Sequence, residues 1–219
     1  MKRIVTTIAV AIATICAVNA QELKFGAKAG LNFSTLSSLE GEQTENEYTT
    51  TTYKTDLGFR TGFHFGAFVE YGFTDQLFVE AGIAYSSQGA KLNSFETKTV
   101  NRWGNIVESS KFEGKDASII LNQVNIPIWV KYDIAGFRPK AGLNLGYLAD
   151  VKAKENGKTE SQDPEKRFDF GLGIGAEYNL PMGLFFDANF TLGLTNLAAK
   201  QSKADIKNRV IQIGVGYKF

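Results

Sequence analysis

Hydrophobic and polar residues alternate along eight segments of this chain. In the last segment, for example, apolar residues at the odd positions from 211 to 219 alternate with polar residues or glycine. A β-strand turns successive side chains to opposite faces, so each segment is predicted to be a two-faced strand. The predicted strands cover residues 23–36, 58–73, 77–92, 117–134, 137–153, 167–180, 184–199 and 208–219.

The connections between these strands alternate strictly between short and long. The short ones, at 74–76, 135–136 and 181–183, carry typical turn residues. The long ones cover about 37–57, 93–116, 154–166 and 200–207. Short periplasmic turns and long outer loops are typical of outer-membrane barrels. The sequence therefore predicts an all-β protein, an eight-stranded antiparallel up-and-down transmembrane β-barrel with both termini at the short-turn end.

The first two long connections carry different signals. Residues 37–57 are acidic and include four consecutive threonines, which predicts a solvated, mobile loop; binding of a cation or a partner is the alternative. Residues 95–107 keep some alternation, which predicts that the flanking strands continue beyond the membrane as a hairpin.

Aromatic residues decide which face of the wall meets lipid. They gather on the apolar face near the short-turn end, as in the girdle that faces lipid headgroups. These residues are Phe25, Tyr71, Phe73, Tyr132, Phe137, Tyr178, Phe186, Tyr217 and Phe219. Glycines crowd the polar face, where the interior of an eight-stranded barrel is narrow. The alternative is a soluble, lipocalin-like barrel with its apolar face turned inward.

The polar face carries seven basic and seven acidic residues, most of them in the half near the short turns. Buried charges must pair, which predicts an interior network of salt bridges that fills the lumen. A gated ion path along the same charges is the rival interpretation. The predicted network comprises Lys24, Lys28, Arg60, His64, Glu70, Glu80, Lys131, Asp133, Arg138, Lys140, Glu177, Asp187 and Lys218. The two other acids, Asp150 and Asp169, lie near the outer rim and could hold a cation.

The only histidine, His64, is predicted to face inward, level with Ser86 on the next strand. A serine and a histidine can act on lipid only if they lie within hydrogen-bond reach of each other. A mid-wall, inward position is poorly placed for a lipid substrate, so we predict a network member and no enzyme. No zinc ligand cluster or nucleotide motif is visible, and no cofactor is expected.

The first twenty residues predict a cleaved secretory signal. Lys2 and Arg3 precede an apolar stretch that ends in Val18-Asn19-Ala20. Cys16 lies inside this leader, so the mature barrel domain, residues 21–219, has no cysteine. Cleavage leaves 22 basic and 23 acidic residues, a balance that argues against nucleic-acid binding.

Several segments resemble the small outer-membrane β-barrel ("porin family", PorT-like) proteins of Bacteroidetes. They are the opening residues 24–32, residues 125–132 with Asn-Ile-Pro followed by Trp-Val-Lys-Tyr, and the terminal Tyr-Lys-Phe. The resemblance implies insertion by the outer-membrane assembly machinery, which reads a C-terminal aromatic signal, here Tyr217 and Phe219. One branch of that family takes part in protein secretion, and no residue here assigns the chain to it.

These observations favour a structural, adhesive or surface-interaction protein of the outer membrane, with a closed lumen and with outer loops that meet the surroundings. Its expected partners are outer-membrane lipid and lipopolysaccharide, the assembly machinery and an envelope protein. An accessory subunit of a secretion or envelope-assembly complex is the alternative. A lipid-modifying enzyme and a soluble ligand-binding barrel are weaker alternatives.

Overall fold

The computed structural model describes residues 23–37, 39–46, 48–114, 117–155, 157–198 and 205–219. Within these ranges the chain forms eleven β-strands. They are β1 (Leu23–Leu36), β2 (Leu39–Asn46), β3 (Thr49–Gly72), β4 (Leu77–Asn101), β5 (Ile106–Glu113), β6 (Ser118–Tyr132), β7 (Phe137–Glu155), β8 (Lys158–Gln162), β9 (Phe168–Asn179), β10 (Leu184–Gly193) and β11 (Asn208–Lys218). The predicted leader, residues 1–20, lies outside the described residues.

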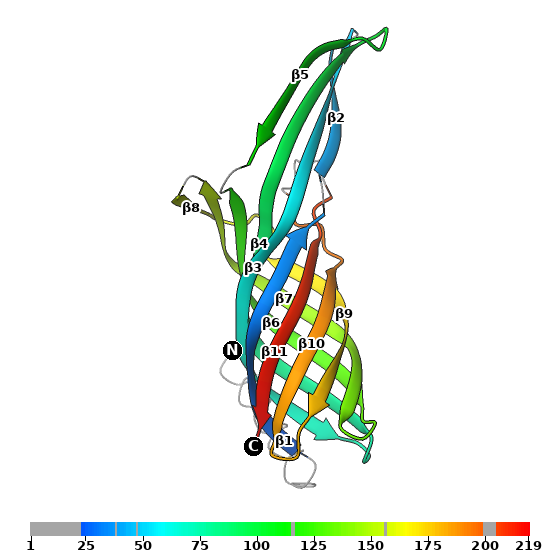
Figure 1. Cartoon of the computed structure of the whole chain (residues 1–219), viewed down its shortest axis with the longest axis vertical. Coiled ribbons are helices and arrows are strands. Elements are labelled where there is room, and N and C mark those ends of the chain that lie inside the picture. Colours follow the sequence, from blue (N-terminus) through cyan, green and yellow to red (C-terminus); the bar gives the residue numbers. More distant parts are fainter. Residues whose placement is uncertain (1–22, 38, 47, 115–116, 156, 199–204) are drawn as a thin grey trace, which may run out of the picture.

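Eight of these strands close into a ring (Figure 1). The hydrogen-bonded order is β3-β1-β11-β10-β9-β7-β6-β4, and antiparallel pairing of β3 with β4 completes the circle. Apart from the closing pair β1–β11, neighbours around the ring follow one another in the chain once the short outer strands are left out. The predicted eight-stranded up-and-down barrel is therefore confirmed, and closure leaves no free edge within the wall.

Tight turns join the strands at the end where the C-terminus lies (Figure 1). Between β6 and β7, Ala135 and Gly136 both have positive φ, 53° and 89°. This pair of left-handed residues is what a two-residue hairpin turn requires. The backbone N–H of Ile134 donates to the Phe137 carbonyl at 2.8 Å, which closes the turn.

The opposite end carries a long extension (Figure 1). β3 and β4 have 24 and 25 residues, whereas a barrel strand needs about 9–11 residues to cross a bilayer. Their outer halves pair with each other and with β2 and β5, which gives a four-stranded sheet in the order β2-β3-β4-β5. We call these paired outer segments, residues 39–56 and 94–113, the outer sheet.

The outer sheet corrects one prediction and confirms another. Residues 37–57 were expected to be a mobile loop, yet they form β2 and the start of β3. Thr49–Thr52 are polar on both faces, so alternation is invisible there, but threonine favours the extended conformation. The hairpin predicted around 95–107 is present as β4 and β5. There Lys111 Nζ lies 2.9 Å from Glu96, and this hydrogen bond raises the pKa of Lys111.

Two other predicted strand boundaries differ from those in the structure. The connection 154–166 contains β8, which pairs with the end of β7. The strand predicted for 184–199 ends at Gly193. Beyond it, the Thr195 hydroxyl, in place of a backbone carbonyl, accepts from the Phe170 N–H at 2.9 Å. Within its described part, the chain contains no helix that is long and apolar enough to cross a membrane.

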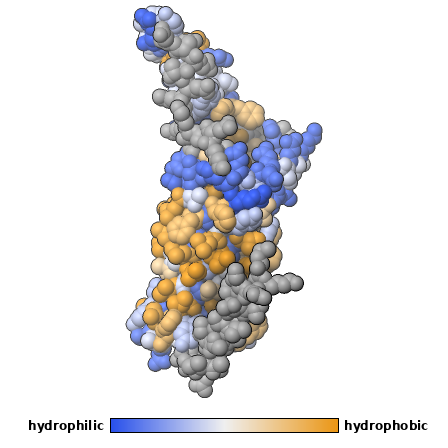
Figure 2. Space-filling view, turned by 180° about the vertical axis from the view of Figure 1, so that it is seen from behind, coloured by the Kyte–Doolittle hydropathy of each residue, from blue (hydrophilic) through white to orange (hydrophobic). Residues whose placement is uncertain are grey.

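The outer surface of the wall is apolar (Figure 2). On the face in view, an orange apolar belt lies below a blue hydrophilic zone. Phe65, Ile174 and Ile213 are more than half exposed on this belt. A water-soluble protein rarely exposes so large a contiguous apolar surface. The apolar residues therefore face lipid, and the alternative of an inward apolar face is wrong.

Candidate functional site in the barrel interior

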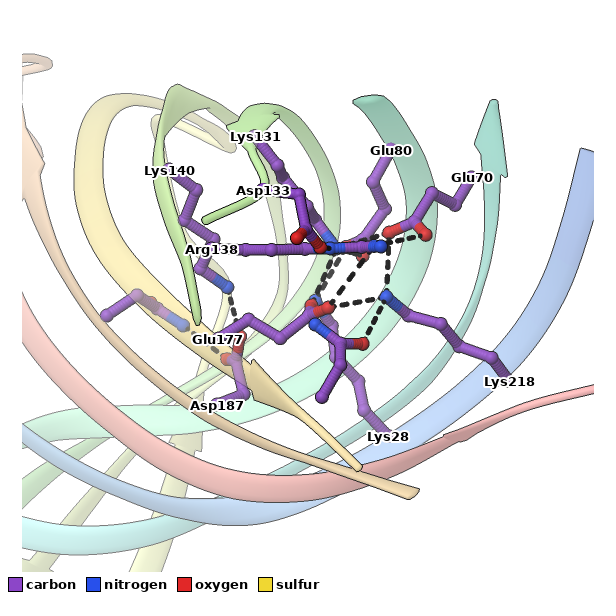
Figure 3. Close-up of polar contacts among 12 residues, drawn as sticks. Lys28, Glu70, Glu80, Lys131, Asp133, Arg138, Lys140, Glu177, Asp187 and Lys218 are labelled. Atoms are coloured by element: carbon purple, nitrogen blue, oxygen red, sulfur yellow. Dashed lines mark hydrogen bonds and ion pairs between the residues drawn. The ribbon is translucent and has the colours of Figure 1, made fainter. Parts of the chain in front are cut away.

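Ten charged side chains converge in the lumen near the short turns (Figure 3). They come from all eight wall strands and from the turn after β6, and five are basic and five acidic. We call this set the charge network. It comprises Lys28, Glu70, Glu80, Lys131, Asp133, Arg138, Lys140, Glu177, Asp187 and Lys218. Strand parity places these residues inside, because each lies on the polar face of its strand.

Lys131 on β6 is the centre of the charge network. Its ammonium lies 2.8 Å from Glu70, 2.5 Å from Glu80 and 2.6 Å from Glu177, and the Lys131 side chain is fully buried. The three carboxylates lie close enough together to ligate a metal ion. The Lys131 ammonium already provides the positive charge between them, so this cluster is an ion-pair centre.

The other network members extend this centre. Lys218, one residue before the C-terminus, pairs with Glu70 at 3.0 Å and with Glu177. Arg138 contacts Glu70 at 2.9 Å and also pairs with Asp133 beside the turn. Lys28 reaches Glu80 at 2.7 Å. Lys140 and Asp187 form a separate buried pair in the same region.

Buried aromatic rings lie between the charged groups. Phe68 and Phe185 meet edge to face with ring centroids 5.7 Å apart. The ammonium of Lys140 lies 4.6 Å from the centre of the Trp129 ring, within cation–π distance. Glycines make room for these rings: a Cβ on Gly216 would lie 2.2 Å from Phe185. The crowding of glycines on the polar face is thereby explained.

Three predicted members lie outside the charge network, which corrects the sequence analysis. Lys24 is exposed at the start of β1, where water can solvate its charge. Arg60 lies nearer the outer end and donates to the Gln88 carbonyl at 3.0 Å. His64 is buried in the middle of the lumen and bonds to Asn32. Strand parity gave the correct side of the wall for Arg60 and His64, and the predicted mid-wall position of His64 opposite Ser86 is confirmed. Their bonding partners were not predicted.

His64 and Ser86 are directly opposite each other on β3 and β4, as the sequence predicts. The amide of Asn32 connects them. His64 Nδ1 lies 2.8 Å from Asn32 Oδ1, and Asn32 Nδ2 donates to Ser86 Oγ at 2.9 Å. A histidine that acts as a general base must reach the nucleophile itself, so this geometry is that of a structural hydrogen-bond chain.

Two further layers of side chains fill the lumen above the charge network. An amide layer, which sequence reasoning did not single out, includes Asn32, Gln88, Gln123 and Asn208. Nearer the outer mouth lies an apolar cluster of Leu36, Ala90, Leu121 and Leu148. The sequence did not reveal the apolar cluster. Its leucines lie on the inward faces of strands whose other inward residues are polar.

Comparison with known proteins agrees with this architecture. The model of the outer membrane protein beta-barrel domain family matches residues 6–219. The chain belongs to this family. It is therefore an outer-membrane protein, and the predicted location is confirmed. No curated protein sequence matches the chain.

Solved structures of the same kind share the fold at low sequence identity. Neisserial surface protein A is 15% identical, with 89% of this chain and 97% of that chain covered and a TM-score of 0.52. Ail, the attachment invasion locus protein of Yersinia pestis, is 17% identical, with 91% and 100% covered and a TM-score of 0.43. OprG from Pseudomonas aeruginosa is 15% identical, with 90% and 95% covered and a TM-score of 0.39. Similarity at this level supports the fold alone.

Proposed function

We propose that this chain is a surface-interaction protein of the outer membrane, in which a closed barrel carries a rigid sheet outward to meet a partner. The outer sheet is the observation that carries this proposal. It places four paired strands beyond the apolar belt, on the side away from the short turns (Figure 1).

The tip of the outer sheet has the composition of a contact surface. Trp103 and Val107 are strongly exposed there. The Arg102 guanidinium lies 4.8 Å from the Trp103 ring and 5.5 Å from that of Tyr48. Exposed tryptophan, tyrosine and arginine are the residues most enriched at binding hot spots. An adhesive role supported by this tip is the simplest form of the proposal.

Site-specific labelling tests the orientation. The chain has a single cysteine, Cys16 in the predicted leader. After cleavage, an introduced cysteine is therefore the only thiol that a maleimide can label. We expect Trp103→Cys to react with a membrane-impermeant maleimide on intact cells. The matched control, Asp75→Cys in an exposed short turn, should react only after the outer membrane is permeabilised. The reverse pattern would contradict the proposal.

The side chains that fill the lumen support the proposal that it is closed. The charge network with its buried rings, the amide layer and the apolar cluster occupy successive levels of an eight-stranded barrel, which is too narrow for a wide water channel. We expect the purified protein to give no steady unitary current in a planar lipid bilayer. A channel-forming barrel run in the same bilayer is the control. Large, stable steps would favour the gated ion path instead.

A second role, as an accessory subunit of a secretion or envelope-assembly complex, is favoured by one feature. β5 is an edge of the outer sheet, and its free backbone groups can pair with a strand from a partner. Recovery of one discrete envelope protein in mild detergent would favour this role. The exposed terminal aromatics Tyr217 and Phe219 suit recognition by the assembly machinery, and the apolar belt suits lipid and lipopolysaccharide.

A further inference from the structure

A small cavity lies inside the barrel in the amide layer. Its volume is about 20 Å³, enough for about one water-sized particle. Its lining comes from β6, β7, β9, β10 and β11, together with Gln88 of β4. The polar residues that matter here are Asn125, Asn144, Asp169, Thr191, Asn208 and Gln212. No charge from the charge network belongs to this lining.

Several buried oxygen atoms in this layer of the lumen lack hydrogen-bond donors. Three belong to its lining: Asn125 Oδ1, Asp169 Oδ1 and Asn208 Oδ1. Two more, Gln123 Oε1 and Asn189 Oδ1, belong to other buried residues of the lumen. Asn125 is only 5% exposed, so bulk water does not reach its oxygen. All five buried atoms without a partner in the described part of the chain are acceptors.

The orientation of two amides follows from Asp169. Gln123 Nε2 and Asn208 Nδ2 both donate to Asp169 Oδ2, at 3.2 and 3.3 Å. Turning either amide over would place its oxygen against the carboxylate. Their own oxygens are thus held away from Asp169 Oδ2. A Cβ on Gly146 would lie 2.8 Å from Asn125 Oδ1 and 2.9 Å from Gln123 Oε1, so these two oxygens are close neighbours.

Asp169 also lacks a positive partner. Among the residues that the structure describes, no lysine or arginine forms an ion pair with it. The two basic residues just before it bind elsewhere: Lys166 Nζ donates to the Asn196 carbonyl, and Arg167 pairs with Asp163. A buried carboxylate without a counter-charge is costly, in contrast to the paired acids of the charge network.

We propose that this cavity binds one hard cation, Ca²⁺ or Na⁺, with Asp169 as the charged ligand and Asn125 and Asn208 as neutral oxygen ligands. Carboxylate and amide oxygens are the ligands that such cations prefer. One water molecule donates only two hydrogen bonds and leaves the charge of Asp169 in place. One cation can be coordinated by several oxygen atoms and neutralises that charge. Asp150, the other acid near the outer rim, lies 3.2 Å from Lys152 and takes no part.

Thermal unfolding of the folded full-length barrel in detergent tests this proposal. The probes are CaCl₂, NaCl and choline chloride at equal ionic strength. We expect the midpoint to rise by a few degrees in Ca²⁺ or in Na⁺ relative to choline, and the more effective salt identifies the ion. In Asp169→Asn this difference should vanish. In the control Asp150→Asn it should persist.

Two results would contradict the proposed cation site. Equal midpoints in all three salts mean that the cavity holds only water. If the unfolding midpoint of Asp169→Asn rises in Ca²⁺ or Na⁺ as much as that of the parent protein, the ion binds elsewhere. If Asp169→Asn does not fold, Asn125→Ala keeps the carboxylate and removes one ligand, and its response should fall without vanishing. An unchanged response in Asn125→Ala would also contradict the site.

Discussion

Replacing Lys131 by methionine should destabilise the barrel by about 3–5 kcal/mol, the cost typical of removing one partner from a buried ion pair. Methionine fills much of the same volume but brings no charge. Glu70, Glu80 and Glu177 would then lie within 4.8 Å of one another without the cation that separates them. Urea unfolding of the protein in detergent micelles, followed by tryptophan fluorescence, measures the change. Trp129, buried beside the charge network, provides the signal.

The control for this prediction is Lys24→Met. Lys24 is exposed and lies outside the charge network, so the change should stay within about 0.5 kcal/mol. A rescue variant separates lost charge balance from lost packing. Adding Glu177→Gln to Lys131→Met restores equal numbers of acidic and basic groups in the charge network. Glu80 keeps Lys28 and Glu70 keeps Lys218, so this variant should recover most of the stability. Equal stability of Lys131→Met and Lys24→Met would show that the carboxylates do not depend on Lys131.

Ile174→Arg should cost about 2–4 kcal/mol, although the side chain is already exposed. Ile174 lies in the middle of β9 and is 64% exposed on the apolar belt. A charge placed there must leave water for hydrocarbon. The measurement is reversible unfolding in phospholipid bilayers, compared with the parent protein.

Val107→Arg is the matched control for this second prediction. Val107 is 61% exposed, but it lies in β5 of the outer sheet, where an arginine stays in water. Its effect should be close to zero. If both arginine variants were neutral, the apolar belt would face water and the membrane orientation would be wrong.

Strand alternation predicted the wall of this barrel well, because each wall strand separates lipid from a polar lumen. β1 matches its predicted bounds, and β11 differs by one residue at its end. The same rule fails where both faces meet water. Thr49–Thr52 show no alternation for this reason, and the outer sheet could not be recognised from residues 37–57.

The interior was only partly predictable. Parity showed that Lys131 and Glu80 face inward, and counting from the short turn gave the level of His64 opposite Ser86. The bonding partners of Arg60 and His64 depend on how side chains from different strands meet in the lumen, which parity does not encode. The unpaired state of Asp169 was equally invisible. It follows from the positions of five other strands relative to β9, and no local pattern contains that information.

The position of Lys218 has a consequence for closure of the barrel. Its amino group joins Glu70 and Glu177, although it is the penultimate residue of the chain. The same strand, β11, pairs with β1 and completes the cylinder. Without β11 the wall would lack both the strand that closes it and one of the five cations of the charge network. Closure of the cylinder and completion of its interior charge balance therefore depend on the same strand.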